Sequence, residues 1–166
     1  ATALHSSPWL PVVESGLLLV AVVHISLTLV KAMANRRAGN TATLRSRRQS
    51  PLAALASRST VVAGLVTLGF LVIHLCQLRW PRPAAGEEAA TLIQVLQQPW
   101  NAVLYAAAAV ALALHLLHGT EAAHRSLGWL TPANSSALRA GAGVLAALIS
   151  GGFLMISVLL ALGGVA

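Results

Sequence analysis

The sequence predicts an all-α integral membrane protein with four transmembrane helices in an up-down bundle. Of its 166 residues, 57% are hydrophobic and 9% are charged, a composition typical of a membrane-embedded chain. The apolar residues form four continuous stretches, each close to the roughly 20 residues that a helix needs to cross a bilayer. Because these stretches do not alternate with polar residues, they argue against β-strands. The stretches cover residues 9–34, 59–79, 98–122 and 138–164.

Charge-free runs, tryptophans and glycines characterise the four stretches. The first is uncharged from Ser15 to Val30, and the second is uncharged from Ser59 to Leu78. Tryptophans fall at or just beyond the stretch ends, as an interfacial aromatic belt requires. The fourth stretch is rich in glycine, which favours close helix packing. Glycines within or at the ends of the first three stretches allow close approach or clearance for a macrocycle, and these are Gly16, Gly64, Gly69 and Gly119.

The basic residues predict the orientation of the chain. Seven of the eleven Lys and Arg residues lie in or beside the polar loop 35–58. The positive-inside rule places that loop in the cytoplasm and both observed termini outside. Membrane topology therefore explains the charge, and we expect no nucleic-acid partner. Such a loop could also bind anionic lipid or dock an acidic soluble subunit.

Three histidines each lie inside a different apolar stretch: His24, His74 and His115. An ionisable side chain in the bilayer core is costly, and it is rare there unless it faces the bundle interior and has a function. Imidazole is a common ligand of haem iron. The three histidines therefore favour haem over other intramembrane chemistry.

Topology converts the positions of these histidines into depths. His24 and His115 each follow a tryptophan at an outer helix end, Trp9 and Trp100, by fifteen residues, which is about 22 Å. His74 precedes Trp80 by six residues, about 9 Å from the outer end of its stretch. Two histidines at one depth on two helices favour a bis-histidine b-type haem nearer the cytoplasm. His74 has no partner at its own depth. An interhelical hydrogen bond, or histidines satisfied by backbone carbonyls, is the alternative.

Further polar residues near the pair are candidate contacts. His118 lies one helical turn from His115 and is the rival ligand. Lys31 shares the helix face of His24, and Arg125 shares that of His118. Both cations are placed to reach a haem propionate from the cytoplasmic side, although Lys31 could equally extend to lipid phosphate.

Motifs in these stretches resemble one family of membrane cytochromes. They are His115-Leu-Leu-His118-Gly119 continuing to Leu127-Gly128-Trp129, the run Ser57 to Gly64 followed by Phe70 and His74, and the run Val12 to Leu17 followed by His24. These resemble the fourth, third and second helices of the diheme cytochrome b subunit that anchors succinate dehydrogenases and fumarate reductases. The stretch 138–164 is similar to the fifth helix. The resemblance covers nearly the whole chain, with the polar loops matching least.

The resemblance implies a ligand set. That family has five helices and four haem-ligating histidines, one on each of its first four helices. By resemblance, His24 and His115 ligate the cytoplasmic-side haem and His74 ligates the outer haem. The family's ligand on the fourth helix is followed four residues later by glycine, which selects His115 over His118. The first helix has no counterpart here, so the resemblance implies a preceding helix or separate chain that supplies a fourth histidine.

The resemblance also implies a function. Such a subunit relays electrons between membrane quinone, commonly menaquinone, and a flavoprotein and an iron–sulfur subunit on the cytoplasmic side. It carries haem b, usually two per complete subunit, lies in a bacterial or archaeal cytoplasmic membrane, and does not itself catalyse succinate chemistry. A cytochrome b anchor of the formate dehydrogenase or hydrogenase type is one alternative. A non-redox helical transporter is another.

Overall fold

The computed structural model describes residues 7–38, 51–80, 83–84 and 86–163. Most of these residues are helical, with no strand among them, and four of the helical segments are long and apolar enough to cross a membrane. The prediction of an all-α chain with four membrane-length helices is therefore confirmed. The chain divides into two compact units, residues 1–45 and 46–166.

The first unit contributes one long helix, α2 (Leu10–Arg37). Pro11 stands in its first turn, where the missing N–H of proline costs no hydrogen bond. Arg36 and Arg37 lie in the last turn, where positive charge interacts favourably with the helix dipole. Thr28 donates its hydroxyl to the backbone carbonyl of His24 at 2.8 Å, which satisfies a polar group inside an apolar span.

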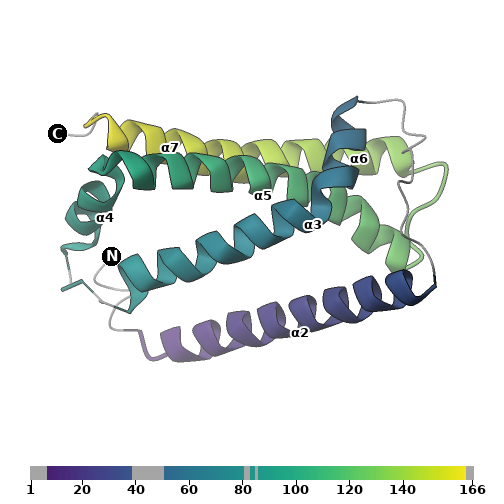
Figure 1. Ribbon diagram of the computed structural model, residues 1–166, viewed down its shortest axis with the longest axis horizontal. Helices are drawn as coiled ribbons and strands as arrows, with labels where there is room; N and C mark the ends of the chain where they lie inside the picture. Colours follow the sequence, from purple (N-terminus) through teal and green to yellow (C-terminus); the bar gives the residue numbers. More distant parts are fainter. Residues whose placement is uncertain (1–6, 39–50, 81–82, 85, 164–166) are drawn as a thin grey trace. The chain divides into compact units, whose positions relative to one another are not determined.

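The second unit is built around α5 (Pro99–Ser126). Two antiparallel neighbours pack on α5 (Figure 1). One is α3 (Pro51–His74), which ends in the π-helical segment η1 (Leu75–Arg79); the other comprises α6 (Ser135–Ala146), the π-helical η2 (Ala147–Gly151) and α7 (Gly152–Ala161). The short helix α4 (Glu88–Gln97) contacts α5 and α7.

Small side chains form most of the core of this unit. The buried residues include alanines on all three long segments, together with Tyr105 and Leu96 as the largest fully buried side chains. In a membrane, helices associate chiefly through van der Waals packing, and small residues allow their backbones to approach closely. The buried alanines are Ala56, Ala63, Ala108, Ala109, Ala111, Ala142 and Ala146.

One helix boundary and one additional helix differ from the sequence prediction. Helix α3 begins at Pro51 and not at residue 59, so residues 51–58 of the predicted loop 35–58 are helical. The predicted span began directly after the charge of Arg58. The helix itself starts earlier, beyond the apolar span, because Pro51 suits a first helical turn and the run Leu-Ala-Ala-Leu-Ala after it has high helix propensity. Helix α4 was not predicted at all. It is too short to span, and it buries Leu96.

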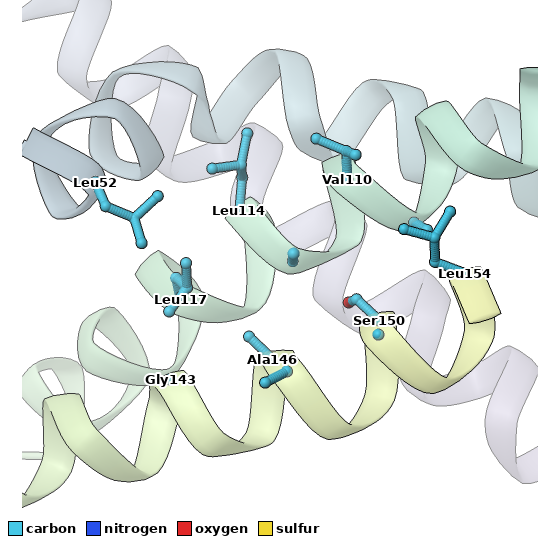
Figure 2. A pocket seen from close by; sticks show the side chains of 12 residues that line it. Leu52, Val110, Leu114, Leu117, Gly143, Ala146, Ser150 and Leu154 are labelled. Carbon is cyan, nitrogen blue, oxygen red and sulfur yellow. The ribbon is translucent and has the colours of Figure 1, made fainter.

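An apolar groove of about 440 Å³ runs between α5 and the α6–η2–α7 segment (Figure 2). Leu52 of α3 closes one end, and leucines and alanines of α5 form one wall. The opposite wall consists of small residues, Leu154 of α7 and one hydroxyl, that of Ser150 in η2. Ser150 is only 4% exposed, and its Oγ makes no hydrogen bond to any described residue.

Candidate functional site

His115 lies on α5 where α3 crosses that helix. A Cβ atom built on Gly64 of α3 would lie 3.3 Å from His115 Cε1 and 3.4 Å from Nδ1. The imidazole therefore lies directly over the glycine, and any side chain at position 64 would press on the ring. Gly69 of the same helix has open space around its Cα. Gly64 is thus the packing position that leaves room for the His115 ring.

The neighbours of His115 toward the end of α5 are polar. His118 lies one turn further on and is half-buried. Glu121 is buried, and its Oε1 accepts a hydrogen bond from Arg125 Nη2 at 2.7 Å. Arg125, predicted as a haem propionate contact, therefore already forms an ion pair with a carboxylate that the sequence analysis missed. The guanidinium is 58% exposed, whereas the carboxylate side chain is 4% exposed.

His74 sits at the end of α3 in an aromatic cluster. Its ring centroid lies 5.5 Å from that of Phe70 and 5.8 Å from that of Tyr105. Tyr105 in turn stacks on Phe153 of α7, with ring centroids 5.9 Å apart and planes 11° from parallel. Tyr105 is 1% exposed. The cluster joins three helical segments around one imidazole.

A chain of hydrogen bonds extends from His74 toward α4. His74 Nδ1 lies 3.0 Å from the hydroxyl of Tyr105, which donates to Gln77 Oε1 at 3.2 Å. Gln77 Nε2 donates to Asn101 Oδ1 at 3.0 Å, and Asn101 Nδ2 donates to the backbone carbonyl of Val95 at 2.9 Å. Gln77 lies in the π-helical turn η1, and π-helical turns are frequent at functional sites.

Of the residues in this hydrogen-bond chain, only His74 was identified from the sequence. Two signals could have revealed them. Gln77 follows His74 by three residues and Asn101 precedes Tyr105 by four, so each pair shares a helix face. Tyr105 is also the single tyrosine of the chain and lies within an otherwise alanine-rich run. A polar face on each of two apolar helices is the pattern of an interhelical hydrogen-bond network.

Two of the other predicted residues, His24 and Lys31, and a further histidine of α5, His124, occupy separate places. His24 and Lys31 lie on α2, which belongs to the other compact unit, so their pairing with α5 residues stays a prediction. His124 places Nδ1 2.8 Å from the Thr120 carbonyl and its ring 6.0 Å from that of Trp129. These contacts occupy His124 at the end of α5.

No group of three His, Cys, Asp or Glu side chains within the described residues is close enough to enclose an ion. A haem requires only axial ligands from the protein, because the macrocycle supplies the other four. No family model, curated protein sequence or solved structure matches this chain.

Proposed function

We propose that this chain is the haem b-containing membrane anchor of a succinate:quinone oxidoreductase, which relays electrons between an iron–sulfur subunit and membrane quinone. One observation carries the proposal. Three helices long enough to cross a membrane, α2, α3 and α5, each hold at least one histidine within the span. Intramembrane histidines are rare and generally functional. Three of them on separate helices match the needs of haem, whose iron takes its axial ligands from different segments.

The surroundings of His115 fit a haem ligand. The ring occupies the space that a side chain at Gly64 would otherwise fill. Glycine at this helix crossing accommodates the imidazole of the proposed ligand. In this proposal His115 and His24 hold the cytoplasmic-side haem, with His118, Lys31 and Arg125 near its propionates. His74 holds the outer haem together with a histidine from a preceding helix or a separate chain.

The protein residues would have defined tasks. Haem b, when bound, accepts and releases one electron at a time. The histidines fix the iron and the orientation of the macrocycle, and the apolar helices exclude water around it. Flavoprotein and iron–sulfur subunits would dock on the cytoplasmic side and menaquinone would exchange electrons within the membrane. No residue of this chain carries the succinate chemistry in this proposal.

A spectroscopic experiment on the purified complex tests the proposal. A reduced-minus-oxidised spectrum should contain a haem b α-band that appears on addition of succinate. His24→Ala and His115→Ala should each remove the same half of the haem signal, whereas His74→Ala should remove the other half. His124→Ala is the matched control on α5, because the contacts of His124 are to Thr120 and Trp129.

Other outcomes would favour other functions. A chain without an α-band would be a non-redox helical bundle, in which the histidines bind protons or substrate. Haem reduced by formate or hydrogen but not by succinate would indicate the anchor of a different oxidoreductase. Loss of different haems in His24→Ala and His115→Ala would contradict the pairing.

A further inference from the structure

In the hydrogen-bond chain around His74, each donor and acceptor is determined by its neighbour, beginning with a backbone carbonyl. The carbonyl oxygen of Val95 can only accept a hydrogen bond. Asn101, whose side chain lies 2.9 Å from that oxygen, must therefore present its NH₂ group to it. This orientation is imposed by chemistry, because an amide oxygen in the same place would face another oxygen. The oxygen of the Asn101 amide is thereby turned toward Gln77.

The donors and acceptors of the remaining hydrogen bonds, up to the imidazole, are determined in the same way. Asn101 Oδ1 can only accept, so Gln77 donates through Nε2 at 3.0 Å and turns its own Oε1 toward Tyr105. Gln77 Oε1 can only accept, so the single hydroxyl proton of Tyr105 points at it, 3.2 Å away. A lone pair of the Tyr105 oxygen then faces His74 Nδ1 at 3.0 Å. Only a protonated Nδ1 can complete this contact.

We infer that Tyr105, Gln77 and Asn101 form a positioning relay that holds His74 in the Nδ1–H tautomer and leaves the lone pair of Nε2 for a metal. A neutral histidine carries one ring proton, and a proton fixed on Nδ1 leaves Nε2 unprotonated. Metal-ligating histidines commonly donate their second ring N–H to a neighbouring acceptor, which sets ring orientation and raises ligand basicity. The tautomer follows from the hydrogen bonds alone, whereas its use toward haem iron rests on the proposed function.

Burial strengthens the preference of the relay for one arrangement of protons. Tyr105 is 1% exposed, and its ring is enclosed by Phe70 and Phe153. In such surroundings a misplaced proton leaves a donor or acceptor without a partner, which costs more than it does in water. The relay therefore ties an imidazole on α3 to a carbonyl at the end of α4 through side chains of η1 and α5.

Nitrogen-15 NMR of the full chain in lipid bilayers tests the tautomer. Histidine is labelled with ¹⁵N, and the His74 signals are assigned by their loss in His74→Gln. We expect wild-type His74 to be protonated on Nδ1. Tyr105→Phe removes the acceptor and should shift His74 toward the Nε2–H form that free neutral histidine prefers. Asn101→Leu cuts the relay at its anchor and should give a mixture of both forms.

A matched control separates the relay from simple packing. Phe153→Leu disturbs the ring that stacks on Tyr105 and leaves every group of the relay in place, so His74 should keep its tautomer. Wild-type His74 protonated on Nε2 would overturn the inference. An unchanged tautomer in Tyr105→Phe, or the same change in Phe153→Leu, would also overturn it.

Redox titration tests the role toward iron separately. If the purified complex binds haem at His74, loss of the acceptor at Nδ1 lowers the basicity of the ligand. Tyr105→Phe should then raise the midpoint potential of the outer haem and leave that of the His24–His115 haem unchanged. An unchanged outer potential would contradict the role toward iron. A complex without haem would refute the proposed function, and the NMR result would still decide the tautomer.

Discussion

His74 and His115 lie on neighbouring helices of one compact unit, yet their imidazoles are placed in different ways. His74 is placed by contact, through a hydrogen bond to Tyr105 and ring contacts with Phe70 and Tyr105. The His115 ring lies over a glycine, Gly64, that leaves room for it. The two sites should therefore fail differently. The His74 site should fail when a group is removed, and the His115 site should fail when a group is added.

The largest effect should come from adding bulk under His115. In Gly64→Leu, even the first side-chain carbon would lie 3.3 Å from the His115 ring, so the ring or the helix must move. Overpacking of this kind costs about 1–3 kcal/mol. We expect loss of the haem signal that His115→Ala also removes, together with lower thermal stability in detergent. Gly64→Ala should have the same effect at smaller amplitude.

The control for this prediction lies on the same helix. Gly69 of α3 has nothing within 4 Å of a built Cβ. Gly69→Leu therefore makes the same change in size, apolarity and helix propensity without touching the histidine. Equal effects at positions 64 and 69 would show that space at Gly64 does not place the His115 ring.

The second effect should come from removing a contact at His74. Tyr105→Phe deletes one oxygen and leaves His74 Nδ1 and Gln77 Oε1, both on half-buried residues, without this partner. Leaving buried polar groups unsatisfied costs about 1–3 kcal/mol, measured as the free energy of unfolding in mixed micelles. In a His74→Phe background the cost of Tyr105→Phe should fall, because part of the penalty has already been removed. Additive effects of the two substitutions would contradict the contact.

A smaller effect on stability should distinguish the two members of the Glu121–Arg125 ion pair, which lies beyond His115 on α5. The Glu121 carboxylate is buried, whereas the Arg125 guanidinium is more than half exposed. Arg125→Gln removes a counter-ion of a buried charge, and Glu121→Gln leaves a cation that water can solvate. We expect Arg125→Gln to lower the melting temperature more than Glu121→Gln does. The reverse order would mean that the carboxylate is stabilised chiefly by something other than this arginine.

The membrane-length helices could be predicted from the sequence because apolar length alone determines them. The stretches around His24, His74 and His115 needed no knowledge of tertiary contacts. The start of α3 at Pro51 was missed because the charge of Arg58 marks the end of the apolar span, whereas helix propensity continues beyond it. The ends of apolar spans and the ends of helices are set by different physical terms.

The surroundings of the histidines were harder to predict than the histidines themselves. Gly64 was one of several glycines with the same sequence signature, and only the crossing of α3 over α5 distinguishes it from Gly69. Gln77 and Asn101 are 24 residues apart, and their contact depends on the relative register of the two helices. Helical spacing specifies which residues share a face, but not which faces meet.

The smallest effect is expected at Ser150, where neither contact nor space accounts for a polar group. Other hydroxyls within these helices bond to the carbonyl four residues earlier, as Ser157 does to Phe153 at 2.8 Å. Ser150 lies in η2 and makes no such bond within the described residues. Ser150→Ala should therefore change the free energy of unfolding by less than about 0.5 kcal/mol, or stabilise the chain, because it removes a buried hydroxyl without a partner. Ser157→Ala, the control, should cost about 0.5–1.5 kcal/mol. If Ser150→Ala costs more than Ser157→Ala, the hydroxyl has a partner in the apolar groove, and extraction of the chain from its lipids should abolish the difference.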